Sequence, residues 1–188
     1  KYAISVSNCT TALHLSLLAL GIKKGDEVIC PSLSFISPAN MVSHVGATLK
    51  LVDVNENDLN INAELIEKEI TSKTKAIIVV HQFGNPADIE EILSISRRHK
   101  LKVLEDNAES IGSKFKNKLT GTFGDIATYS FFGNKIMTTG EGGMIVTNNI
   151  NYYKKIKILR DHGLTNRKKY VHSFLGFNYR LTNIQAAI

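Results

Sequence analysis

Ala76-Ile-Ile-Val-Val80 contains no polar residue, and it is followed by the helical pattern Ile89–His99 and by a second strand pattern, Lys102-Val-Leu-Glu105. A continuous apolar run of this length is typical of a strand that is buried on both faces of a parallel sheet. Asp88 precedes the helical pattern, where an aspartate can accept hydrogen bonds from the first free backbone N–H groups. The order strand, helix, strand therefore predicts a parallel β-α-β unit.

The same alternation of strand and helix patterns continues on both sides of this unit. Strands are predicted at residues 3–6, 27–30, 47–52, 127–132 and 144–147, and helices at residues 10–20, 36–45, 63–71, 151–159 and 181–188. We therefore predict the α/β class, as a three-layer α/β/α sandwich around a mainly parallel central sheet. Sheets of this kind bind ligands beyond the carboxyl ends of their strands, close to helix N-termini.

Length and composition limit the kind of protein. The 188 residues can form one sizeable core, and 43% of them are hydrophobic. No apolar run reaches the ~18 residues of a membrane span, and the first residues form no secretory signal, so no membrane partner is predicted. Because the chain lacks a start methionine and opens directly on a strand, we expect it to be a fragment of a longer protein.

Charge and cysteine content bear on nucleic-acid binding, metal binding and disulfide formation. The net charge is +6, with one basic cluster at Arg167-Lys168-Lys169, and a modest positive field suits a phosphorylated substrate. No basic stripe is interleaved with aromatic residues, so nucleic acid is not a predicted partner. Cys9, Cys30 and the scattered histidines have no metal-ligand spacing. Neither a metal site nor a disulfide is predicted, and a cytoplasmic location is expected.

Lys135 is the single cation in a glycine-rich connection between the strands predicted at 127–132 and 144–147. No acid stands beside it in the sequence. Desolvation makes a lysine amine nucleophilic, which is what Schiff-base chemistry requires. An ordinary solvated loop lysine is the alternative, and this residue alone does not decide between the two.

Two further stretches place polar groups at predicted strand ends. Ser7-Asn-Cys-Thr-Thr11 lies between a strand and a helix, where free backbone N–H groups form an anion site, although a plain helix cap gives the same pattern. Glu105 and Asp106 end a buried strand, and alternation points their side chains to opposite sides. One carboxylate can therefore enter the site and hold a protonated ring nitrogen, with a helix-capping aspartate as the alternative.

The remaining candidates are weaker individually. Phe35 follows a strand end and can stack on a planar ligand, although an isolated phenylalanine is more often part of the core. For His81, a hydrogen-bonded core histidine is favoured over a site residue. Asn178 and Arg180 precede the last predicted helix, where capping and phosphate binding both stay open. An anion site, a carboxylate, an aromatic ring and a lysine are together what pyridoxal 5'-phosphate (PLP) needs.

Eight ordered motifs carry a resemblance to a known family: SNCTTALHLSLLAL, GDEVICPSLSF, GATLKLVDV, TKAIIVVHQFGNPAD, LEDNAES, GDIATYSFFGNKIMTTGEGGMIVTNN, LRDHGL and GFNYRLTNIQAAI. The chain resembles the DegT/DnrJ-type nucleotide-sugar aminotransferases, which are fold-type I PLP enzymes, over essentially its whole length. The resemblance implies that residues 1–188 are the PLP-binding large domain, without the N-terminal segment and the small C-terminal domain of the family.

The resemblance also implies roles around the cofactor ring. Lys135 would be the catalytic lysine that binds PLP covalently, and Asp106 would pair with the pyridine nitrogen. Glu109 would lie near the phenolic oxygen of the cofactor. Phe35 would lie over the cofactor ring.

The cofactor phosphate has a second set of implied contacts. Thr10 and Thr11 would bind it through backbone and hydroxyl groups, helped by Ser130. Asn178 would reach the phosphate of a neighbouring subunit, which implies a homodimer with a composite active site. Cys9 departs from the small residue usual in the family, and a positive φ there would be strained, so a slight adjustment of the phosphate loop is expected.

The reaction implied by the resemblance is transfer of an amino group from L-glutamate to a nucleotide-linked keto-deoxy-sugar. GDP-4-keto-6-deoxymannose or a similar 4-keto sugar is the expected acceptor, pyridoxamine 5'-phosphate the intermediate form of the cofactor, and surface polysaccharide or O-antigen biosynthesis the expected setting. Two alternatives stay open. One is a sugar dehydratase of the same family, which carries histidine in place of the lysine, and the other is a non-catalytic PLP-binding regulator.

Overall fold

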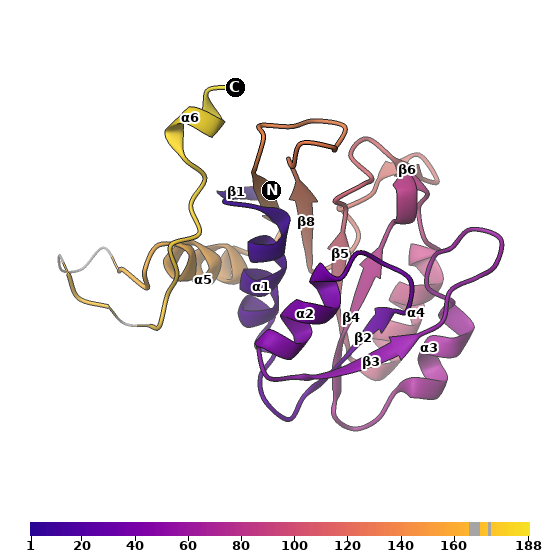
Figure 1. Cartoon of the computed structure of the whole chain (residues 1–188). Coiled ribbons are helices and arrows are strands. Elements are labelled where there is room, and N and C mark those ends of the chain that lie inside the picture. Colours follow the sequence, from indigo (N-terminus) through magenta and orange to yellow (C-terminus); the bar gives the residue numbers. More distant parts are fainter. Residues whose placement is uncertain (166–169, 173) are drawn as a thin grey trace.

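The computed structural model describes residues 1–165, 170–172 and 174–188 (Figure 1). The basic cluster Arg167-Lys168-Lys169 lies outside these residues. None of the helices in the described part of the chain combines the length and the apolar character needed to cross a membrane.

A seven-stranded sheet in the order β1-β9-β8-β5-β4-β2-β3 forms the centre of the described chain. The strands from β3 to β8 in this order are parallel, and β9 pairs antiparallel with both β8 and β1. A short separate hairpin consists of β6 and β7. The strand bounds are β1 Tyr2–Val6, β2 Glu27–Pro31, β3 Thr48–Val52, β4 Thr74–Val80, β5 Lys102–Asp106, β6 Lys114–Phe115, β7 Lys118–Leu119, β8 Ile126–Ser130 and β9 Gly143–Thr147.

Helices cover both faces of this sheet, so the predicted three-layer α/β/α sandwich with a mainly parallel sheet is confirmed (Figure 1). α1, α2 and α5 pack on one face, and α3 and α4 pack on the other. A 3-10 turn, η1, follows β4, and α6 lies near the end of the chain. The helix bounds are α1 Cys9–Leu20, α2 Ser37–His44, α3 Ala63–Glu69, η1 Gln82–Gly84, α4 Ile89–His99, α5 Ile150–Arg160 and α6 Asn183–Ala186.

The strand interiors are apolar because each face of the sheet is covered. In β2, Val28 and Cys30 belong to the core under α1, whereas Ile29 belongs to the core under α4. All three are at most 1% exposed. Burying side chains of this size stabilises a fold by roughly 1.5–3 kcal/mol each relative to exposure. This two-sided core fixes the register of the strands, and with it the positions of the polar residues at their carboxyl ends.

The predicted elements agree with the structure to within a few residues, except at the last helix. A helix was expected over residues 181–188, but α6 spans only Asn183–Ala186. The reason lies in a capping box: Thr182 Oγ1 accepts the N–H of Gln185 at 3.2 Å, and Gln185 Oε1 accepts the N–H of Thr182 at 3.1 Å. This reciprocal pair ends the extended backbone at Thr182 and starts the helix one residue later.

Candidate active site

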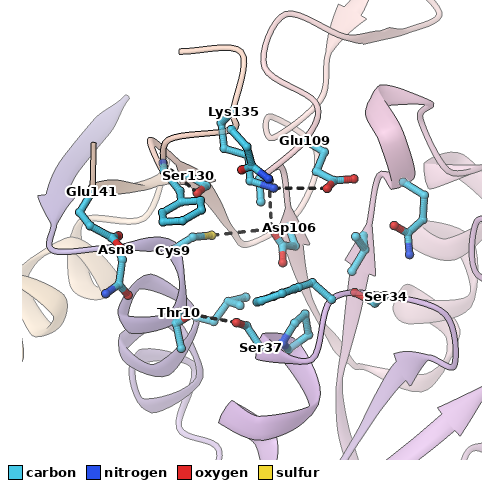
Figure 2. Close-up of a pocket in the computed structure, with 18 residues that line it drawn as sticks. Asn8, Cys9, Thr10, Ser34, Ser37, Asp106, Glu109, Ser130, Lys135 and Glu141 are labelled. Atoms are coloured by element: carbon cyan, nitrogen blue, oxygen red, sulfur yellow. Dashed lines mark hydrogen bonds and ion pairs between the residues drawn. The ribbon is translucent and has the colours of Figure 1, made fainter. Parts of the chain in front are cut away.

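A pocket of about 360 Å³ lies beyond the carboxyl ends of β4, β5 and β8 (Figure 2). Its size is within the range of small-molecule sites. The lining comes from the start of α1, residues 34–38 before and within α2, the segment after β5 and the connection between β8 and β9. The fold thus gathers groups that are far apart in the sequence at the edge where parallel sheets bind ligands.

Lys135 projects into this pocket from the connection between β8 and β9 (Figure 2). Its Nζ donates to Oε1 of Glu109 at 3.3 Å, and Oε2 of Glu109 accepts the backbone N–H of Phe83 at 3.0 Å. The lysine side chain is 19% exposed. The expectation of a partly desolvated lysine is therefore confirmed, and its counter-ion comes from a segment distant in sequence.

The two carboxylates at the end of β5 lie on opposite sides of the strand, as the alternation predicts. Asp106 lines the pocket and is only 5% exposed. Burial raises its pKa, although the N–H of Ala108 and the charge of Lys135 partly offset this effect. Glu105 is fully buried and accepts three backbone N–H groups of residues 121–124 at 2.6–2.8 Å. Asp106 is thus the carboxylate that a ligand can meet.

His81 supports Glu105 and does not line the pocket. Its ring is fully buried, Nδ1 accepts the N–H of Ala87 at 3.1 Å, and Nε2 donates to Oε2 of Glu105 at 3.2 Å. The preference for a hydrogen-bonded core histidine is confirmed. Among the described residues, no group of three or more His, Cys, Asp or Glu side chains is placed to hold a metal ion.

The N-terminus of α1 forms one wall of the pocket. Asn8 caps it: its Oδ1 accepts the N–H of Thr11 at 2.9 Å, and Thr11 Oγ1 donates to the Asn8 carbonyl at 2.8 Å. The Thr11 hydroxyl is therefore engaged in the cap. Nothing within the described ranges accepts the backbone N–H groups of Cys9 and Thr10. Both remain available to an anion at the positive end of the helix.

Two hydroxyl groups extend this anion-binding wall. Thr10 Oγ1 and Ser37 Oγ are 2.8 Å apart, and Ser130 lines the pocket at the end of β8. Gly143 brings β9 close to the start of α1, since a Cβ there would lie 2.6 Å from the carbonyl carbon of Asn8. A larger residue would push the anion-binding wall away from the sheet.

Phe35 and Asn178 lie at different places relative to the pocket. Phe35 is 76% exposed and lines the pocket from the segment before α2. Asn178 is exposed and lies outside the lining, in a segment tied to the residue that follows β1 through a hydrogen bond from the Ser7 N–H to the Tyr179 carbonyl at 2.9 Å. All the predicted cofactor contacts except Thr11 and Asn178 therefore line one pocket.

Sequence reasoning missed Gln82, which also lines the pocket. Its backbone N–H donates to Asn60 Oδ1 at 3.1 Å, and its side-chain amide donates to the carbonyl of Leu33. Its position just beyond β4, at the carboxyl edge of the sheet, is the signal that would have found it. The expected strain at Cys9 is absent, because Cys9 is the first residue of α1 and has no positive φ.

The groups in this pocket fit PLP. Lys135 supplies an amine, and Cys9 and Thr10 supply free N–H groups for a phosphate. Within the described chain, Oδ1 of Asp106 takes the hydrogen bonds of that carboxylate and Oδ2 takes none, so one oxygen is left for a protonated ring nitrogen. These three groups meet the requirements of the ring, the aldehyde and the phosphate of the cofactor.

Comparisons with known proteins point in the same direction. The GDP-perosamine synthase of Caulobacter vibrioides is 52% identical over all 188 residues, which correspond to 51% of its own length. The solved aminotransferase of Psychrobacter cryohalolentis superimposes with a TM-score of 0.94 at 39% identity, covering the whole of this chain and 50% of that one. NtdA of Bacillus subtilis, solved with bound pyridoxamine phosphate, gives a TM-score of 0.94 at 38% identity, over 42% of its chain.

These relatives are about twice as long as the chain described here, which spans about half of the length of the curated relatives it matches. The sequence profile of one family covers residues 1–188 without interruption. The superpositions on solved aminotransferases agree with that match. The chain belongs to the DegT/DnrJ/EryC1/StrS aminotransferase family.

Proposed function

We propose that the protein containing this chain is a PLP-dependent aminotransferase that moves the amino group of L-glutamate to a nucleotide-linked keto-deoxy-sugar. The observation that carries the proposal is the meeting of Lys135, Asp106 and the free N-terminus of α1 in one pocket. Similarity to GDP-perosamine synthases supports GDP-4-keto-6-deoxymannose, or a similar 4-keto sugar, as the acceptor. The amino-sugar product suits surface polysaccharide or O-antigen biosynthesis in the cytoplasm.

Each wall of the pocket has a separate task in this reaction. When bound, PLP supplies an electron sink for charge that develops at the reacting carbon. Asp106 keeps the ring nitrogen protonated through a charge-assisted hydrogen bond. Lys135 carries the proton to and from the reacting carbon, and its position 3.3 Å from Glu109 holds the amine inside the pocket beforehand. Glu109 would lie near the phenolic oxygen of the cofactor.

The phosphate and the ring face are held by other parts of the lining. The N–H groups of Cys9 and Thr10 bind the phosphate at the start of α1, with the hydroxyl of Ser130 nearby. Phe35 covers the ring face. Thr11 has an indirect role, because its N–H and hydroxyl groups form the hydrogen bonds of the helix cap that orients the N–H groups of Cys9 and Thr10.

A second copy of the protein completes the site in this proposal. Asn178 is exposed and outside the pocket of its own chain, which suits a contact with the phosphate in a neighbouring subunit. Phe35 and Phe132 line the pocket and are exposed. Ile36, Ile136 and Met137, close to these residues or to Lys135 in the sequence, are exposed as well, and a second copy would cover these apolar side chains. Residues 1–188 would be the large domain of each subunit.

The test uses the full-length protein and follows each half of the reaction. Titration with PLP is expected to produce an absorbance band at the edge of the visible range, which L-glutamate then removes with release of 2-oxoglutarate. A panel of nucleotide-linked 3-keto and 4-keto sugars then identifies the acceptor. Lys135→Ala is expected to abolish both halves, and full turnover by this variant would overturn the assignment.

The same experiment separates the two alternative functions. A dehydratase would remove a hydroxyl group from the sugar and use no glutamate, and Lys135 in the pocket stands against it. A PLP-binding regulator would give the absorbance band but no 2-oxoglutarate. Either outcome with the wild-type protein would replace the proposed aminotransferase.

A further inference from the structure

The thiol of Cys9 lies against the buried carboxylate of the pocket (Figure 2). Its Sγ is 3.8 Å from Oδ1 of Asp106, within reach of a hydrogen bond from sulfur. The same oxygen accepts the backbone N–H of Ala108 at 3.0 Å. Oδ1 of Asp106 therefore accepts two hydrogen bonds, one from the segment that follows β5 and one from α1.

Cys9 is in its protonated form at neutral pH, so it can act only as the donor to a carboxylate. Burial raises the pKa of the Cys9 thiol well above its usual value, and the negative charge of Asp106 raises it further. A thiolate at this position would face a like charge across the contact. The thiol of Cys9 is therefore the donor in this hydrogen bond, and the carboxylate of Asp106 is the acceptor.

The position of the thiol is fixed by the elements around it. Cys9 is the first residue of α1, directly after the N-cap Asn8. Gly143 of β9 packs so closely that a Cβ there would lie 2.8 Å from the backbone nitrogen of Cys9. The glycine therefore lets the start of the helix lie directly against the sheet, and this close approach places the sulfur opposite Asp106.

We propose that Cys9 is a positioning residue for the cofactor site: its thiol donates to Oδ1 of Asp106 and turns Oδ2 toward the ring nitrogen of PLP. A carboxylate that is buried on one side of a pocket can rotate about its last bond unless one oxygen is tied down. Two donors on Oδ1 remove that freedom. The proposal rests on the proposed PLP function for its consequence, but the hydrogen bond itself does not depend on a bound cofactor.

Infrared spectroscopy of the S–H stretch tests the hydrogen bond in the full-length protein before PLP is added. Cys30 offers a control, since it is also a free cysteine but is fully buried and does not line the pocket. We expect the band lost in Cys9→Ala to lie at lower frequency and higher intensity than the band lost in Cys30→Ala. Asp106→Asn should move the Cys9 band to higher frequency and leave the Cys30 band in place. Equal frequencies for the two thiols, or a Cys9 band indifferent to Asp106→Asn, would overturn the proposal.

Cofactor affinity tests the consequence of the hydrogen bond. A hydrogen bond from a weak donor such as a thiol contributes about 1 kcal/mol net, so Cys9→Ala is expected to raise the Kd for PLP about three- to tenfold. Cys9→Ser keeps a donor and should recover most of the affinity, and Cys30→Ala should bind like the wild type. An unchanged Kd in Cys9→Ala would refute the positioning role. Failure of the wild type to bind PLP would refute the proposed function instead, while the infrared result would stand.

Discussion

Nζ of Lys135 lies 3.3 Å from Oε1 of Glu109, although 26 residues separate the two in the chain. The second oxygen of Glu109 accepts the N–H of Phe83, which is in a left-handed conformation with φ of 51° just after β4. One carboxylate therefore links the amine of the connection between β8 and β9 to the turn beyond β4. The amine is held in the pocket by this link before any ligand arrives.

Replacing Glu109 by Gln separates the charge of this link from its geometry. The amide oxygen can still accept the N–H of Phe83, but the ion pair with Lys135 is lost. We expect the rate of the glutamate half-reaction to fall about tenfold, equivalent to about 1.4 kcal/mol of transition-state stabilisation. Single-turnover absorbance measures this rate. Glu64→Gln on α3 serves as the control, and an unchanged rate in Glu109→Gln would refute the role of the link.

Asp106 is expected to reduce stability in return for function. Burial raises the pKa of Asp106. The contribution of this side chain to the free energy of unfolding is therefore most favourable below the unfolded pKa near 3.8, where the group is neutral, and it is lost as the pH rises through the folded pKa. Asp106→Asn should therefore have an equal or higher Tm than the wild type at pH 7 without cofactor. The same variant should bind PLP at least tenfold more weakly, because a charge-assisted hydrogen bond is lost.

The stability of Asp106→Asn and its affinity for PLP can be measured together. Thermal unfolding with and without PLP gives both quantities from one set of samples, because a ligand that binds only the folded state raises Tm. A large drop in the Tm of Asp106→Asn without cofactor would mean that the carboxylate is a structural group and not one held ready for a ligand.

Glu105, its neighbour on the opposite side of β5, is expected to behave in the reverse way. Burial raises its pKa, but hydrogen bonds from His81 and from the backbone of residues 121–124 outweigh this and hold the pKa below its usual value. Its stabilising contribution is thus present above the unfolded pKa near 4.5 and is lost as the pH falls through the folded value. Glu105→Ala should lower the free energy of unfolding by about 3–5 kcal/mol, because it strands a buried histidine and three donors.

Urea unfolding of Glu105→Ala at pH 7 measures this cost. Glu90→Ala, on the exposed surface of α4, is the matched control and should change the free energy of unfolding by less than about 1 kcal/mol, even though it removes the ion pair with Lys116. Similar effects of the two substitutions would show that the buried hydrogen bonds of Glu105 add nothing to the fold.

The opposite roles of Glu105 and Asp106 could be predicted in part from the sequence. Strand alternation separated their directions, and their position at the end of a strand in a predicted parallel sheet placed both at the ligand-binding edge. The sequence did not indicate that Glu109 would meet Lys135, because that contact depends on how two loops are placed by the whole sheet. For Ser7–Thr11 the sequence left an anion site and a plain helix cap both open, and the structure gives the Thr11 hydroxyl to the cap, in a capping box with Asn8.

His14 packs against the segment that carries Asn178. The ring of His14 is 4% exposed and lies between His44 of α2, at 4.7 Å between ring centroids, and Phe177, at 4.8 Å. Its Nδ1 is 3.4 Å from the hydroxyl of Tyr179. Burial, with a smaller effect of His44, lowers the pKa of His14 to about 4. The neutral ring is therefore part of the surface on which residues 177–179 pack.

The sign of the pH dependence follows from this lowered pKa. Between about pH 6.5 and pH 4 the unfolded chain binds a proton at His14 that the folded chain does not, so the free energy of unfolding falls as the pH is lowered through this window. The full loss is about 3 kcal/mol. His14→Gln should remove this part of the pH dependence in urea unfolding at pH 7.5 and pH 5, whereas His99→Gln, on the exposed end of α4, should retain it. Equal pH dependence in the wild type and His14→Gln would show that protonation of His14 does not oppose folding.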